Sequence, residues 1–256
     1  MPAVNSEMKR IIREKDLMLK TGTQAMLDIL KELQKQVMTE LGQAALGSWN
    51  AYQLKQLLNS IEFQIANFTQ KARAEASGLI KEAWGKGTSL IDDPLAVNGI
   101  YTGFAISTSV LDTLSDFVFH KIKNLSDDAW VKIRGELTLG MLGGKTPQEV
   151  AKAIGKNLTD PSIFSSIAQR AEVITKTEMG RAFSTAAQTR MEQAAQHVDG
   201  LEKQWLHAGH PKKPRTAHMA AHGQHVPVNE PFNIGGMKMM YPRDPAAPLE
   251  EVINCG

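Results

Sequence analysis

Apolar residues recur at spacings of three and four through the first three quarters of the chain, the period of amphipathic helices. An early stripe of this kind joins Leu30 to Leu41. A longer one starts near Ser48 and runs to Gly85 and Gly87, where we expect the helix to end. The early stripe consists of Leu30, Leu33, Val37 and Leu41, and the longer one of Leu54, Leu57, Leu58, Ile61, Ile65, Phe68, Ala72, Leu79 and Ala83.

The segment 85–103 is rich in turn residues, and we predict a loop there. A further helix is expected over 106–122, where apolar residues again share one face. Ser126 is a suitable N-cap, and the acidic pair that follows it favours the start of another helix, which would end at Gly143 and Gly144.

Thr146, Pro147 and Glu149 form a compact start signal: a cap, a proline suited to the first turn, and a glutamate at the capping-box position. The short helix that they predict ends near Gly155. The Ala-rich stretch 162–196 then predicts a long helix, interrupted only at Gly180.

The texture changes after Gly200, because seven of the eleven prolines lie beyond residue 210. Scattered apolar residues among turn signals predict short strands. The expected fold is therefore mainly α, with an elongated helical region over 1–198 and a small irregular α+β module over 199–256. We call residues 199–256 the C-terminal module. Its expected apolar residues are Trp205, Val226, Val228, Phe232, Ile234 and Met239.

Composition adds limits to this picture. The 256 residues carry a formal net charge of only +2, too small to indicate nucleic-acid binding by bulk charge. The single cysteine, Cys255, excludes an intramolecular disulfide. The mixed-charge start has no apolar run, and we expect neither a signal peptide nor a membrane partner.

An ordered series of motifs runs from Arg170 to Cys255. The series opens on the long helix, and continues through a Trp, an Arg-x-x-His pair, a Pro-Phe segment, Pro-x-Asp-Pro and a terminal Asn-Cys. Its members here are Arg170, Ala171, Thr177, Glu178, Trp205, Arg215, His218, Gly223, Phe232, Pro242, Asp244, Pro245, Asn254 and Cys255. This series resembles the Mu-F-like family of phage head morphogenesis proteins, also called minor head proteins.

Two features depart from the family pattern. The loop after Trp205 carries His207, His210 and two lysines where the family usually has an acidic residue, and the sequence ends at Gly256, before the second cysteine of the usual Asn-Cys-x-Cys. The resemblance implies a low-copy component of a virion head, made in the host cytoplasm. It also implies docking to portal protein, with scaffold protein, major capsid protein and non-specific double-stranded DNA as further partners.

His218 and His222 are four residues apart between Pro214 and Gly223, so a helix there would place both imidazoles on one face, a chelating geometry. With Cys255 they form a candidate zinc site. The alternative is that Arg215 and His218 make hydrogen bonds in a loop-rich core, and we favour it. HMAAH lacks the glutamate of a zinc protease helix.

An enzyme remains the competing class: a metal-dependent nuclease, or a toxin-like protein delivered with the genome. It would use these histidines with Asn229, Asn233 or Asp244, although the spacing matches no compact nuclease motif. We expect no catalytic residues and no bound cofactor other than that zinc. Lys212, Lys213 and Arg215 form a small basic cluster that we interpret as a solvated loop. Glu178 and Arg181 are expected to form a surface ion pair.

Overall fold

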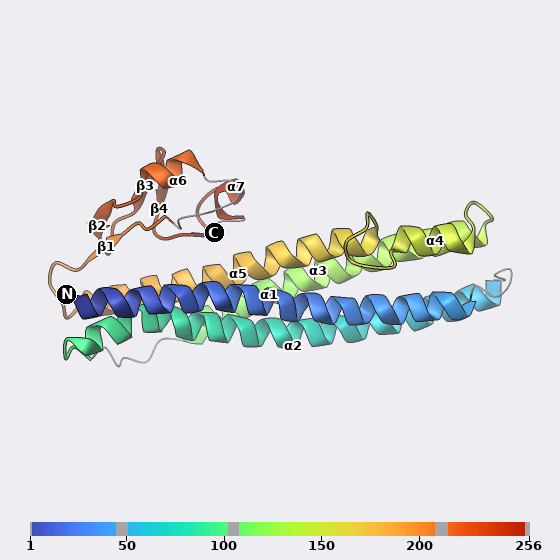
Figure 1. The fold of residues 1–256 in the computed structure, drawn as a ribbon, viewed down its shortest axis with the longest axis horizontal. Coiled ribbons are helices and arrows are strands. Elements are labelled where there is room, and N and C mark those ends of the chain that lie inside the picture. The colour runs from blue at the N-terminus through green and yellow to red at the C-terminus, as the bar shows by residue number, and fades with distance from the viewer. Residues whose placement is uncertain (1, 45–50, 102–107, 208–214, 254–256) are drawn as a thin grey trace. The chain divides into compact units, whose positions relative to one another are not determined.

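The structure, a computed structural model, describes residues 2–44, 51–101, 108–207 and 215–253. It is mainly helical, with long helices first and short antiparallel strands near the C-terminus, which confirms the expected fold class (Figure 1). The elements are α1 (Pro2–Ala44), α2 (Ala51–Val97), α3 (Thr108–Met141), α4 (Pro147–Ile154), α5 (Ile163–Ala194), β1 (Glu202–Gln204), α6 (Thr216–Ala220), β2 (His225–Pro227), β3 (Phe232–Ile234), β4 (Met237–Met239) and α7 (Leu249–Val252).

The chain forms two compact units. The first comprises Met1–Lys20, Leu79–Leu114 and Lys176–Gly256, and therefore contains the strands. The second comprises Thr21–Gly78 and Ser115–Thr175. Our division at residue 198 stays a prediction about which part of the chain folds alone.

The second predicted helix extends much further than its pattern indicated. α2 continues through Gly85 and Gly87, and contains Pro94, so the loop predicted over 85–103 is wrong up to Val97. Ion pairs hold this extension: Lys86 with Glu14, Asp93 with Arg10 (2.8 Å), and Asp92 with Arg190 of α5 (3.1 Å). A glycine costs a helix only about 1 kcal/mol, so such contacts override it.

α2 ends in a Schellman motif. The N–H of Ile100 donates to the carbonyl of Leu95, that of Gly99 to Ala96, and Gly99 has a φ of 74°.

The two helices predicted on either side of Ser126 are one helix, α3. Ser126 is buried inside it and its hydroxyl donates to the carbonyl of Ile122 at 3.0 Å, so it is not an N-cap. The buried face continues across this position through Ile122, Leu125, Ala129 and Ile133. An unbroken apolar face favours continuing the helix over restarting it.

α4 confirms the capping box. The Thr146 hydroxyl accepts from the Glu149 N–H, and the Glu149 carboxylate accepts from the Thr146 N–H at 2.7 Å. These hydrogen bonds, the backbone one foremost, lower the pKa of Glu149. Pro147 begins the helix and Gly155 follows its end, as predicted.

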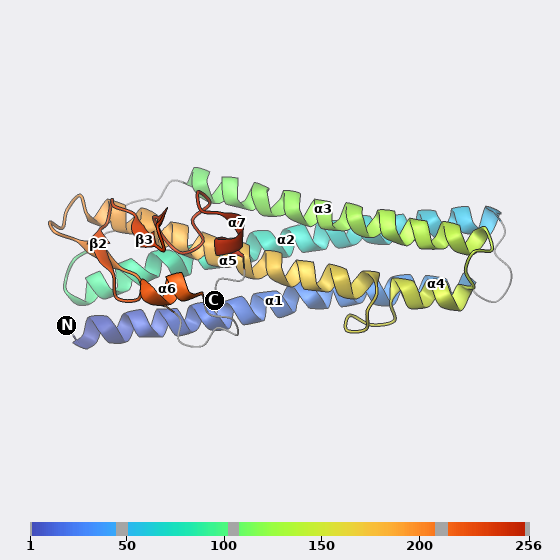
Figure 2. The ribbon, with the colours of Figure 1, turned by 90° about the horizontal axis from the view of Figure 1, so that it is seen from above.

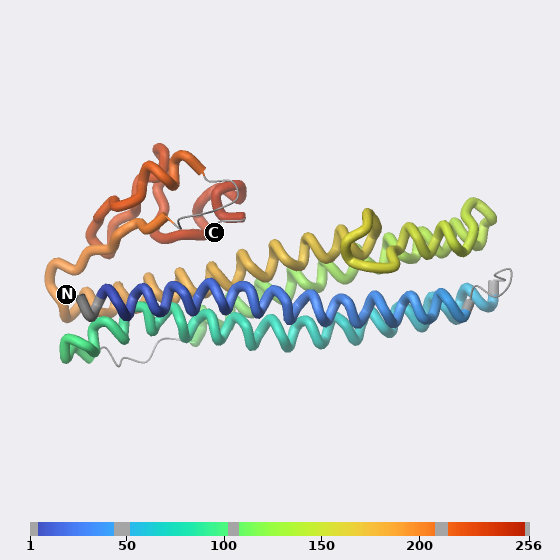
Figure 3. Tube along the Cα trace, viewed as in Figure 1, coloured from blue at the N-terminus to red at the C-terminus, as the bar shows by residue number. Residues whose placement is uncertain are grey.

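α5 is not interrupted at Gly180, and Figure 3 shows its backbone as one continuous helix. Its residues are buried almost all round, which explains the absence of a single apolar stripe. One side packs closely on α2, since a Cβ on Gly87 would overlap the carbonyl of Phe183 and crowd Ala186. The Lys15 ammonium of α1 lies 5.8 Å from the Phe183 ring centre.

The C-terminal module contains two small antiparallel sheets. β1 pairs with β2, with Lys203 opposite Val226, and β3 pairs with β4, with Asn233 opposite Lys238. Figure 2 shows these strands with α6 and α7. The strands predicted after Gly200 are confirmed, and their apolar core joins Trp205, Ala221, Phe232, Ile234 and Met239.

Candidate functional site

The helical part of the motif series lies on α5, where Glu178 and Arg181 form an ion pair. The pair is buried, with 1% of Glu178 and 5% of Arg181 exposed, so the predicted surface pair is wrong. Arg181 also donates through Nε to the carbonyl of Arg243 at 3.4 Å. Thr177, which precedes Glu178 in the sequence, is also buried. The Glu178–Arg181 pair therefore belongs to a packed interior. Arg170, earlier on α5, forms a separate ion pair with Asp128 of α3.

The Pro-x-Asp-Pro segment, from Pro242 to Pro245, builds the turn that meets α5. The Asp244 carboxylate accepts from the N–H of Met240 at 2.8 Å and from that of Ala246 at 2.9 Å. Arg243 takes a φ of 66°, uncommon for a residue with a side chain, and its guanidinium lies against Gly180. Gly180 thus leaves room for this guanidinium and does not break the helix.

Lys203 is a second anchor from the module and is 5% exposed. Its ammonium donates to the Gln188 side chain of α5 at 3.1 Å and to the carbonyl of Met240 at 2.8 Å, and lies 5.2 Å from the Phe232 ring centre. Burial lowers the pKa of Lys203 to about 8, although the carboxylates of Glu192 and Asp244 raise it.

Gln188 and Thr185 complete the contact. Gln188 donates through Nε2 to the carbonyl of Val228 at 3.0 Å and to Glu192 at 2.7 Å. The Thr185 hydroxyl lies 3.4 Å from that of Tyr241, whose pKa is raised, chiefly by burial. We call this contact the polar seam: Gly180, Arg181, Thr185 and Gln188 of α5 against Lys203, Val228, Tyr241 and Arg243 of the module.

Sequence reasoning missed most of the polar seam. It identified the Pro-x-Asp-Pro segment without its partner, and it did not single out Lys203, Gln188, Tyr241 or Arg243. A signal existed in α5, where Arg181, Thr185 and Gln188 recur at spacings of four and three within an Ala-rich helix. Such a polar stripe on a helix that is otherwise buried indicates a polar partner.

Trp205 anchors the remaining motif residues. Its ring meets those of Phe232 and His218 edge-on, at centroid distances of 5.2 and 5.6 Å. His218 is buried and its Nε2 lies 2.9 Å from a carboxylate oxygen of Glu251. Arg215 donates to three carbonyls around α7, those of Glu250, Glu251 and Ile253. Both polar residues therefore make hydrogen bonds that tie α6 to α7 within the module.

His222 engages a different group from His218, since its Nδ1 accepts from the backbone N–H of His207 at 3.1 Å. Gly223, with a φ of 85°, follows the turn after α6, and its N–H donates to the carbonyl of Trp205. Across the described ranges, no three His, Cys, Asp or Glu side chains are grouped to hold a metal ion. Asn254, Cys255, His210, Lys212 and Lys213 lie outside those ranges, so the zinc site stays a prediction.

Two of the residues considered for a nuclease, Asn233 and Asp244, have hydrogen bonds within the module. The Asn233 side chain accepts from the N–H of Gly236 at 2.8 Å, in the turn between β3 and β4. Its N–H donates to the Gln224 side chain at 2.8 Å. Asp244, as described above, accepts from two backbone N–H groups. This pattern fits turn formation, and a nuclease stays an untested alternative.

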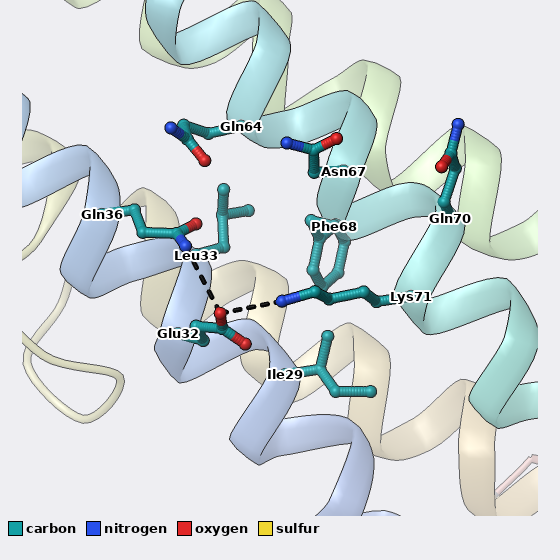
Figure 4. A pocket seen from close by; sticks show the side chains of 9 residues that line it. All are labelled: Ile29, Glu32, Leu33, Gln36, Gln64, Asn67, Phe68, Gln70 and Lys71. Atoms are coloured by element: carbon teal, nitrogen blue, oxygen red, sulfur yellow. Dashed lines mark hydrogen bonds and ion pairs between the residues drawn. The ribbon is translucent and has the colours of Figure 1, made fainter.

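A shallow cavity of about 170 Å³ lies between α1 and α2 (Figure 4). Four amide side chains surround it, and the Glu32 carboxylate accepts from Lys71 at 2.8 Å and from Gln36 at 3.4 Å. These lining residues offer no nucleophile with a neighbouring base. The lining residues are Ile29, Glu32, Leu33, Gln36, Gln64, Asn67, Phe68, Gln70 and Lys71.

Residues 131–255 match the family model described as Phage Mu protein F like protein. The match confirms the resemblance and extends it from Arg170 back to Val131, in the middle of α3. Neither a curated protein nor a solved structure matches the chain. Within the described residues, no helix has the length and apolar character to cross a membrane.

Proposed function

We propose that the chain is a minor head protein of a phage and docks to the portal vertex, because residues 131–255 match the family model for Phage Mu protein F like proteins. The observation that carries the docking step is an exposed apolar stripe on α3. An enzymatic role has weaker support, because His218 and His222 have hydrogen-bond partners within the module and the family is a structural one.

The exposed stripe lies apart from the buried face of α3. At 100° per residue, Phe117, Val131 and Leu139 of α3 fall within a sector of roughly 80°, and the exposed Leu142 directly follows the end of the helix. Val131 is 67% exposed and Leu142 is 70% exposed. The buried residues from Val118 to Leu137 point to a sector centred roughly 130° away.

A second apolar face on a helix whose first face is already buried needs a covering partner. Phe117 and the three aliphatic residues provide the aromatic and apolar centre typical of a protein interface. Lys121, whose ammonium lies 4.5 Å from the Phe117 ring centre, falls in the same sector and adds a charge beside the aromatic end of the stripe. Three of its four members lie within the family match. We therefore assign the stripe to portal protein; scaffold, major capsid protein and DNA stay predictions.

The test is co-purification with the portal protein of the same virion. Val131→Glu and Leu139→Glu, together, place charge at the centre of the stripe and should weaken portal binding at least about tenfold, since each 1.4 kcal/mol is a factor of ten. Phe63→Glu is the matched control, because Phe63 is an exposed apolar residue of α2 outside the stripe. Equal binding by wild type and double variant would exclude the stripe as the docking surface.

A further inference from the structure

The C-terminal module has an apolar core of its own. Trp205, Ala221, Phe232, Ile234 and Met239 pack on one another, and the partly buried residues against them, Ala217, Val226 and Ala247, are also from the module. α5 contributes no member to this cluster. The burial that holds the module together is thus separate from the contact that holds it to α5.

The contact with α5 has the opposite character. Hydrogen bonds across the polar seam join Lys203 with Gln188, Gln188 with Val228, Thr185 with Tyr241 and Arg181 with Arg243, and the Arg243 guanidinium also lies against Gly180. The last two hydrogen bonds are long, at 3.4 Å. Water can replace each of these bonds when the surfaces separate, so their net stabilisation is modest.

The opposite side of α5 makes a much closer contact, with α2. There Gly87 of α2 approaches so closely that a methyl group would overlap the backbone of Phe183. Close packing of this kind is lost only at a large cost. α5 therefore packs closely on α2 at one face, where Gly87 meets the backbone of Phe183. At the other face its closest contact, at Gly180, is with the flexible end of the Arg243 side chain, beside hydrogen bonds that water can replace.

We propose that the C-terminal module is a folded cover that undocks from α5 as one body, by separation at the polar seam. Undocking leaves the core around Trp205 intact and exposes the face of α5 from Gly180 to Gln188. Gln188 is the residue of α5 with two hydrogen bonds to the module: its side chain accepts from Lys203 and donates to the carbonyl of Val228. It also donates to Glu192 of α5. This inference does not depend on portal docking.

Thiol labelling of the full chain in a Cys255→Ser background measures the undocking. Ser184 is 8% exposed and lies between Gly180 and Gln188 at helical spacing, so Ser184→Cys is a near-isosteric probe of the seam. Thr175 is 6% exposed, and nine residues away on α5 it points to the opposite side, so Thr175→Cys is the matched probe. We expect Cys at 184 to react with a maleimide at least about tenfold faster than Cys at 175 under native conditions, since local opening precedes global unfolding.

Gln188→Ala, added to the Ser184→Cys chain, should speed labelling at least about tenfold further, while the emission of Trp205 and the amide protection of β3 and β4 stay unchanged. Gln169→Ala makes the same substitution at an exposed position of α5 and should leave the rate unchanged. Equal rates at positions 184 and 175, or loss of β3 and β4 protection together with labelling, would overturn the proposal. The first result means that the seam opens only on global unfolding, and the second that the module unfolds when it leaves.

Discussion

Gly85 and Gly87 of α2 are two residues apart but differ in the space available for a side chain. A Cβ on Gly87 would overlap the backbone of Phe183, whereas a Cβ on Gly85 would meet nothing within 4 Å. We expect Gly87→Ala to lower the free energy of unfolding by about 1–3 kcal/mol through overpacking. Gly85→Ala should raise it by up to about 1 kcal/mol through helix propensity. Denaturant titration of both variants checks this, and a stabilised Gly87→Ala protein would contradict the close approach of α2 and α5.

Lys203 predicts a particular pH dependence. Its pKa of about 8 in the folded protein lies below the ordinary value of 10.5, so the unfolded chain binds more protons between these values. The free energy of unfolding should therefore receive a contribution from Lys203 that rises from about pH 8 to 10.5. Urea titrations at several pH values should show this rise in wild type and lose it in Lys203→Met.

The matched control for that experiment is Lys238→Met, because Lys238 is an exposed lysine of the same module. It should keep the wild-type pH profile. Identical profiles for all three proteins would show that the Lys203 ammonium is not desolvated in the folded state.

At the residue scale, the sequence predicted apolar burial well and polar burial poorly. Leu30, Leu33, Val37 and Leu41 are all buried, as their spacing indicated. Glu178 and Arg181 are buried too, although a spacing of three is equally typical of a surface pair. Spacing along one helix reports which residues share a face, and a polar face becomes an interior only when another part of the chain covers it.

At the element scale, local sequence signals predicted helix ends that the structure does not have. The chain passes in helical conformation through Gly85, Gly87, Ser126 and Gly180, where breaks were predicted. Each signal is worth about 1 kcal/mol or less, and the neighbouring elements supply ion pairs or close packing that exceed it. The capping box of α4 was predicted correctly because all its partners lie within four residues of one another.

The C-terminal module depends on its aromatic residues to an unusual degree. Truncating a buried Trp costs about 3–5 kcal/mol, close to the total stability of a small unit. We expect Trp205→Ala to abolish the slow amide exchange of β3 and β4 while the far-ultraviolet helical signal is largely kept. Leu206→Ala is the control, since Leu206 is its exposed neighbour and should change neither signal. Parallel loss of both signals would show that helices and module unfold together.

The predicted zinc site lies in the same C-terminal module and can be tested there. If His218, His222 and Cys255 hold a metal, a chelator should lower the melting temperature of the wild type, and His218→Ala should remove that effect. If chelator changes nothing, His218 acts only through Glu251 and Trp205, and His218→Ala alone should be destabilising by about 1–3 kcal/mol, the usual cost of an unpaired buried group. Differential scanning fluorimetry with and without chelator separates the two outcomes.

At the scale of the whole molecule, the family match and the apolar stripe of α3 lead to a prediction about the protein without its partner. An exposed stripe of large apolar residues promotes association of like chains. We expect the isolated protein to form concentration-dependent oligomers in sedimentation velocity, and the double change Val131→Glu with Leu139→Glu to shift it to monomer. Phe63→Glu, which alters an exposed apolar residue elsewhere, should leave the oligomers in place.

Portal protein should compete with this self-association, because both use the same residues. Adding portal to the wild type should therefore replace the oligomers by a portal complex, with no free pool of larger species. The double variant should be monomeric and should not bind portal. Two results together would exclude a role for the stripe: the wild type is monomeric at all concentrations, and the wild type and the double variant bind portal with equal affinity. The match to the family model would stand, and the docking surface would have to lie on another face of the molecule.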